Sequence, residues 1–156
     1  MVGCNNARTR HNEAHITLVK ELIKNDVLVV QTGCSQMALA KAGLTTPGAS
    51  ALAGPGLAEV CEVVGIPPVL HLGSCVDNSR ILIACSEMVR VGGLGDSIAD
   101  LPVAGAAPEW MSEKAISIGQ YFVASGVFTV FGVTYPIVEN TKFHELLFDG
   151  LEKQGL

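Results

Sequence analysis

The sequence predicts an α/β fold: a Rossmann-like three-layer domain with a mainly parallel sheet and helices on both faces. Two observations lead to this prediction. Short aliphatic segments alternate with amphipathic segments of helical length. Hydrophobic residues make up 49% of the chain and charged residues only 16%, which suits strands that are buried on both faces. The length of 156 residues fits one domain, so we treat residues 1–156 as a single Rossmann-like domain.

Each expected strand follows an amphipathic helical pattern. The clearest pattern covers residues 13–25, where Ile16, Val19 and Ile23 recur at helical spacing. Further helices are expected at residues 56–65, 79–91, 111–125 and 142–154. Aliphatic strands are expected at residues 27–30, 67–73, 101–105 and 127–132, and residues 45–56 read as a long loop. This order predicts successive βαβ units.

Both ends of the chain are incomplete as parts of such a fold. "MVGCNN" resembles the last residues of a strand, and no strand follows the helical pattern at residues 142–154. We therefore expect the domain to be a fragment of a larger multidomain protein.

Composition excludes several classes of function. The net charge of −5 argues against nucleic acid as a partner, because phosphate binding needs a basic surface. No apolar run reaches the roughly 18 residues of a membrane helix, so no membrane association is expected. The first ten residues lack the apolar core of a signal peptide, and we expect a cytoplasmic protein.

The chain contains five cysteines, an odd number that favours free thiols or metal ligands over a disulfide framework. Cys61 and Cys85 lie inside helical patterns, where we expect them to be buried and to act as small hydrophobic residues. Cys4, Cys34 and Cys75 each follow the end of an expected strand, close to a glycine, in "VGC", "QTGC" and "LGSC".

The carboxyl ends of parallel strands lie along one edge of a sheet, where ligands bind. Three thiols would therefore meet at this edge. Such a set suits a soft metal or an iron–sulfur site. The alternative is that the three cysteines are small buried residues that occur in turns by chance, and the pattern alone leaves it open.

A fourth strand end, "APEWMSEKA", adds Glu109, Trp110, Glu113 and Lys114 to the same edge, with Ser112 as a plausible N-cap. Lys114 could be an ordinary solvated residue. It could also donate a hydrogen bond or a proton to a bound oxyanion.

The four histidines give weaker signals. His11 and His15 are four residues apart and could share a helical face as metal ligands, but polar residues at a helix start are the favoured interpretation. His71 is expected to be packed within a strand, and His144 needs no special role.

Four motifs together resemble the C-terminal domain of anaerobic nickel–iron carbon monoxide dehydrogenases, including the form that partners acetyl-CoA synthase. They are "VGCNN", "QTGCSQMALAKAGL", "LHLGSCVDNSR" and "APEWMSEKAISIGQYFVASG", in this order over nearly the whole chain. The resemblance implies an oxidoreductase that converts CO and water into CO2, two protons and two electrons.

The resemblance also implies roles for individual residues. Cys4, Cys34 and Cys75 would bind cluster C, the nickel–iron–sulfur cluster of the active site, with Cys75 beside nickel and the other two on iron. Lys114, in the SEKA motif, would hydrogen-bond the bound carboxylate and assist proton movement.

The family completes cluster C with a histidine and two cysteines from upstream domains, which this sequence does not contain. We therefore expect the isolated chain to be inactive, with the cluster absent or incomplete, and the parent enzyme to be a homodimer. Three alternatives remain: a domain of a reductase like the hybrid-cluster protein, a metal-free α/β domain that binds a small molecule, and a structural piece that associates with a separate chain supplying the missing ligands. The "GSCVDNSR" and "SEKA" contexts favour the dehydrogenase over the hybrid-cluster protein. No GxGxxG follows an expected strand, which argues against nucleotide binding.

Overall fold

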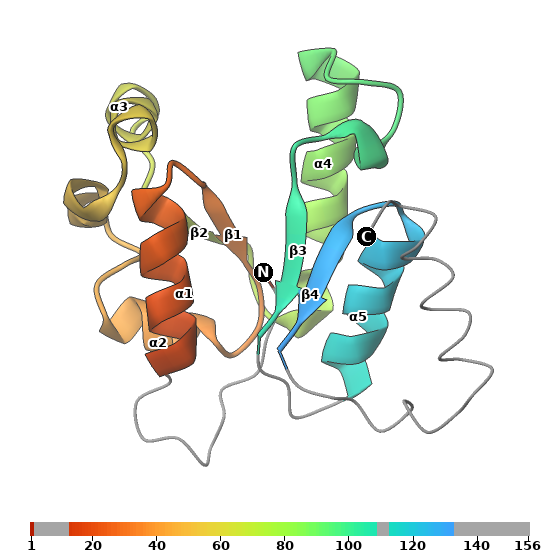
Figure 1. Cartoon of the computed structure of the whole chain (residues 1–156), viewed down its shortest axis with the longest axis horizontal. Helices are drawn as coiled ribbons and strands as arrows, with labels where there is room; N and C mark the ends of the chain where they lie inside the picture. The colour runs from red at the N-terminus through yellow and green to blue at the C-terminus, as the bar shows by residue number, and fades with distance from the viewer. Residues whose placement is uncertain (2–12, 109–112, 133–156) are drawn as a thin grey trace.

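A computed structural model of the chain describes residues 1, 13–108 and 113–132 (Figure 1). Helices and parallel strands alternate along them, so the predicted α/β class is confirmed. In chain order the helices and strands, with 3-10 helices marked η, are α1 (Glu13–Lys24), β1 (Val29–Gln31), α2 (Gln36–Lys41), η1 (Pro47–Leu52), α3 (Pro55–Val64), β2 (Val69–His71), η2 (Cys75–Asp77), α4 (Ser79–Gly92), η3 (Ile98–Asp100), β3 (Ala104–Ala107), α5 (Glu113–Ala124) and β4 (Phe128–Phe131).

The strands form two parallel pairs. β1 pairs with β2 in a register that sets Gln31 opposite His71, and β3 pairs with β4 so that Ala107 lies opposite Phe131. In Figure 1, β1, β3 and β4 all run toward the lower part of the view. On β1, the Met1 amino group donates to the Val30 carbonyl at 2.6 Å, and the Thr32 amide donates to the Met1 carbonyl at 3.1 Å. Met1 therefore continues the parallel pairing at β1.

The main hydrophobic cluster packs α1, α2 and α3 against β1 and β2. Its buried members are Val19, Ile23, Val29, Leu39, Leu44, Leu57, Cys61 and Val69. The larger side chains of this set each stabilise the fold by roughly 1.5–3 kcal/mol through burial. This packing fixes the positions of β1 and β2, and so of the turns that follow them.

Asp26 connects the end of α1 to the start of α3. Its backbone is left-handed, with φ of 62°, and its Oδ1 accepts a hydrogen bond from the Leu57 amide at 2.8 Å. A Cβ on Gly54 would lie 2.4 Å from the same oxygen, so only glycine fits at that position. The contact supplies an acceptor for a free amide in the first turn of α3.

The bounds of all four strands differ from the predicted ones, and one predicted loop is wrong. β1 begins at Val29 rather than at residue 27, because the Val27 amide still bonds to Leu22 in the turn after α1. β3 begins at Ala104 rather than at residue 101, since residue 102 is a proline that cannot donate to a strand ladder. The expected loop at 45–56 contains η1 and the start of α3, and both of these helices begin at a proline.

Within the described part of the chain, none of the helices combines the length and apolar character needed to cross a membrane.

Candidate metal centre

The first cysteine turn, residues 32–35, connects β1 to α2. Gly33 adopts a positive φ of 93°, which brings Cys34 to the surface, where it is exposed. The Gln31 side-chain amide donates to the Ser35 hydroxyl, and both side chains are fully buried. Gln31 Oε1 has no hydrogen-bond partner within the described residues. The turn thus combines buried polar side chains, Gln31 and Ser35, with the accessible thiol of Cys34.

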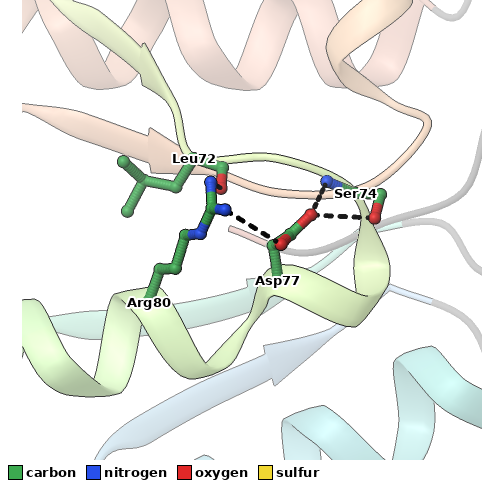
Figure 2. Close-up of polar contacts among 4 residues, drawn as sticks. All are labelled: Leu72, Ser74, Asp77 and Arg80. Carbon is green, nitrogen blue, oxygen red and sulfur yellow. Dashed lines mark hydrogen bonds and ion pairs between the residues drawn. The ribbon is translucent and has the colours of Figure 1, made fainter.

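The second cysteine turn, residues 73–78, connects β2 to α4. Gly73 has a φ of 118°, and a Cβ at this position would lie 2.5 Å from the Asp77 carboxylate. Asp77 Oδ2 accepts hydrogen bonds from the Ser74 amide at 2.8 Å and from the Ser74 hydroxyl at 2.9 Å (Figure 2). These bonds close a capping box over η2, whose first residue is Cys75.

The electrostatics of this turn favour an ionised Asp77. The hydrogen bonds from the Ser74 hydroxyl and amide lower the pKa of the Asp77 carboxyl, and the Arg80 guanidinium lowers it further. Arg80 Nη2 lies 3.4 Å from Asp77 Oδ1, and its Nη1 donates to the Leu72 carbonyl at 3.2 Å (Figure 2). Arg80 therefore connects the end of β2 to the start of α4 across the cysteine turn.

The two cysteine turns are hydrogen-bonded to each other. The Leu72 amide donates to the Gln31 carbonyl at 2.9 Å, and the Gly33 amide donates to the Gly73 carbonyl at 3.1 Å. Cys34 and Cys75 follow these bonds by one and two residues, and both are free thiols, the second half-buried. The expected placement at the ends of parallel strands is thus observed for these two cysteines. Cys4, the third expected member, lies outside the described residues.

A polar side-chain pair that the sequence analysis did not single out also connects the turns. The Thr32 hydroxyl donates to Asn78 Oδ1, and Asn78 Nδ2 donates to the Cys75 carbonyl. The available signal was a polar residue beside each cysteine motif, at Thr32 and Asn78, but spacing alone does not show that two such residues meet.

The donor set fits part of an iron–sulfur or nickel–iron–sulfur cluster. Thiolates are the soft ligands that such clusters use, and two of them stand on adjacent turns with access to solvent or to a bound group. Among the described residues, no group of three or more histidine, cysteine, aspartate or glutamate side chains could hold a metal ion. Cys34 and Cys75 would therefore need further ligands to complete a site.

The other two cysteines are buried, as predicted. Cys61 in α3 is 3% exposed and Cys85 in α4 is 5% exposed. Burial raises the pKa of the Cys85 thiol, although the Met1 amino group opposes this effect. A thiol in such surroundings stays protonated and packs as a small apolar group.

Lys114 is the second residue of α5, the helix that follows β3, and its side chain is exposed. This placement leaves its ammonium group accessible to a bound ligand or to solvent. The side chain of Glu113, and Glu109, Trp110 and Ser112 as whole residues, lie outside what the structure describes.

The structure corrects one histidine prediction and qualifies another. His71 ends β2 with an exposed side chain, so its predicted packing inside the strand is wrong. His15 does lie near the start of α1, but it is fully buried, because it shares a helix face with Val19 and Ile23 of the core. His11 and His144 lie outside the described residues.

Comparison with known proteins settles the family. Residues 1–155 match the Prismane/CO dehydrogenase family. The chain belongs to this family. It is 60% identical over 152 residues to carbon monoxide dehydrogenase 1 of Methanosarcina acetivorans, an alignment that covers 97% of this chain and 24% of that protein. The chain therefore spans about a quarter of the length of this relative.

Solved structures of carbon monoxide dehydrogenases are similar to this chain in fold. The nickel-free crystal structure of carbon monoxide dehydrogenase from Thermococcus sp. AM4 matches with a TM-score of 0.82 and 57% identity, over 93% of this chain and 23% of that one. An acetyl-CoA synthase/carbon monoxide dehydrogenase, described with nickel–zinc and nickel–nickel Fe4S4 clusters in its alpha subunits, matches with a TM-score of 0.80 and 36% identity over 93% of this chain and 23% of that one.

Proposed function

We propose that this chain is the part of a carbon monoxide dehydrogenase that contributes Cys4, Cys34 and Cys75 to a nickel–iron–sulfur active-site cluster. The observation that carries the proposal is the Gly33–Gly73 hydrogen bond, which joins two accessible thiol turns at the carboxyl ends of paired parallel strands. Membership of the family and the 60% identity to a carbon monoxide dehydrogenase support the proposed reaction, in which CO and water yield CO2, two protons and two electrons.

The bound cluster would supply the site for CO and water and would accept the two electrons. The role of this chain is to hold that group: Cys75 beside nickel, and Cys34 and Cys4 on iron. Gly33 lies directly before Cys34 and Gly73 two residues before Cys75, and backbone without a side chain at these positions lets a bulky cluster approach the sheet edge.

Lys114 acts on the substrate side in this proposal. Its exposed ammonium at the start of α5 would donate a hydrogen bond to a carboxylate group held at the site, and would relay to solvent a proton that the reacting water releases.

The rest of the enzyme would provide what this chain lacks. Upstream domains would supply the remaining cluster ligands, and the full-length protein would act as a homodimer in the cytoplasm of an anaerobe, in some organisms with acetyl-CoA synthase as partner. Residues 1–156 then form one Rossmann-like domain of a multidomain enzyme, and the isolated chain does not turn over CO.

Anaerobic purification of the full-length enzyme that contains this sequence tests the proposal. Cys75→Ala should lose nickel and lower CO oxidation by more than about 100-fold, since removal of a ligand exceeds the roughly 10- to 100-fold effect of residues around the ligands. Lys114→Ala should retain nickel and iron but lose most turnover, and Lys114→Arg should recover part of it.

Cys61→Ala is the matched control, because it removes a cysteine that is 3% exposed and lies inside α3. It should retain metal and activity. Equal nickel and iron in the Cys75→Ala and wild-type enzymes would contradict the assignment of Cys75 as a ligand.

A further inference from the structure

We propose that Thr32 and Asn78 are positioning residues, which together hold the Cys34 turn and the Cys75 turn at the spacing that the metal cluster requires. This inference rests on the function proposed above. It adds to the cysteines a pair of neutral residues that touch no metal and act through the turns.

Asn78 contacts both turns with one side chain. Its Oδ1 accepts the Thr32 hydroxyl hydrogen bond across 46 positions of sequence, and its Nδ2 donates to the Cys75 carbonyl. Its own carbonyl accepts the Ile81 amide at 3.0 Å in the first turn of α4. The end of β1, the Cys75 turn and the start of α4 therefore meet at one residue.

The pair is buried although both of its neighbouring thiols are accessible. Thr32 is fully buried and Asn78 is 7% exposed, whereas Cys34 is exposed and Cys75 is half-buried. Hydrogen bonds are stronger in such low-dielectric surroundings, and an unpaired partner is costly there. The rigid connection thus lies in the interior, and the groups that it orients lie at the surface.

Apart from this pair, the described residues connect the two turns through the backbone bonds from Gly33 to Gly73 and from Leu72 to Gln31. They fix the strand ends but precede both cysteines. The Asn78 contact to the Cys75 carbonyl comes after the last of these bonds, so it restrains the part of the turn that carries the thiol. Residues that orient metal ligands in this way typically change metal affinity or activity by roughly 10- to 100-fold when they are replaced.

The test uses the full-length enzyme, with nickel and iron content and the electron paramagnetic resonance spectrum of the cluster measured beside activity. Thr32→Val removes the hydroxyl and leaves the shape unchanged. It should lower nickel occupancy or activity by roughly 10- to 100-fold and shift the cluster spectrum. Thr32→Ser keeps the hydroxyl and should restore the wild-type spectrum.

Thr129→Val is the matched control. Thr129 lies in β4, which pairs with β3 in a sheet separate from that of β1 and β2; it is 7% exposed, and its hydroxyl donates to the Val127 carbonyl at 3.0 Å. The same substitution there removes a buried hydroxyl hydrogen bond far along the chain from both cysteine turns. It should lower thermal stability as Thr32→Val does, but leave metal content and spectrum unchanged.

Asn78→Asp provides a second, independent variant in case Thr32→Val does not accumulate. It keeps the acceptor for Thr32 and replaces the donor to the Cys75 carbonyl with an oxygen, so it should also lose nickel and shift the spectrum. Wild-type metal content and spectrum in both Thr32→Val and Asn78→Asp would overturn the inference while leaving the proposed function intact. A wild-type enzyme without nickel and iron–sulfur would instead overturn the proposed function.

Discussion

Two pairs of cysteines in this chain occupy opposite kinds of position. Cys34 and Cys75 follow strand ends, in turns opened by glycines with positive φ, and their thiols are accessible. Cys61 and Cys85 lie inside helices and are 3% and 5% exposed. The same side chain is thus placed as a possible ligand in one case and as core packing in the other, and the backbone around each cysteine makes the difference.

The largest effect expected from this contrast is in thiol reactivity. In the folded, metal-free chain, Cys34 and Cys75 should react with iodoacetamide at least about 100-fold faster than Cys61 and Cys85, because a local opening free energy of about 3 kcal/mol is enough to slow labelling by that factor. Mass spectrometry of timed samples locates the label. In denaturant the four rates should converge, and similar rates in the folded chain would contradict the division of the cysteines.

A smaller effect is expected in stability. Cys85→Ser buries a hydroxyl among apolar groups in α4 and should lower the free energy of unfolding by about 2 kcal/mol. Cys34→Ser at the exposed turn should change it by less than about 0.5 kcal/mol. Urea unfolding of the two variants measures the difference, and equal losses would show that the Cys34 turn contributes to the core.

The smallest effect is expected when the charge of the Asp77 carboxylate, which caps the Cys75 turn, is removed. Asp77→Asn should speed the labelling of Cys75 at pH 7 and lower the unfolding midpoint slightly, because the carboxylate caps η2 and pairs with Arg80. The pKa of Asp77 is lowered in the folded state, so its contribution is complete above the ordinary carboxyl value and is lost as pH falls through the lowered one. The unfolding midpoints of the wild type and the variant should therefore converge in acid, below about pH 4.

Glu87→Gln is the control for this charge. Glu87 pairs with Arg90 three residues later on the exposed surface of α4, as Asp77 pairs with Arg80, but it caps no turn. Its loss should leave the labelling of Cys75 unchanged. If Glu87→Gln speeds that labelling as much as Asp77→Asn does, the cause lies in α4 as a whole.

Much of this arrangement could be predicted from the sequence. Short aliphatic runs alternate with amphipathic segments, so the alternation of the four strands with α1, α3, α4 and α5 and the place of Cys34 and Cys75 at strand ends followed from local pattern. The short helix α2 was not predicted. The burial of Cys61 and Cys85 could also be predicted, because both lie at apolar positions of helical patterns.

The remainder depends on contacts that no local pattern contains. The meeting of Thr32 with Asn78 requires the register of β1 against β2, which is fixed by the packing of α1, α2 and α3. The exposure of His71 has the same origin, because alternation within a strand shows which residues share a face but not whether that face is covered.

The pairing of β1 with β2 also sets an order of events during folding. Parallel neighbours need a crossover between them, and here α2, η1 and α3 form it. The Gly33–Gly73 bond can form only after that crossover has closed, which makes the contact non-local and slow to appear. A newly synthesised chain that ends before β2 therefore presents Cys34 without its neighbour, and the two cysteine turns come together only once synthesis has passed Asn78.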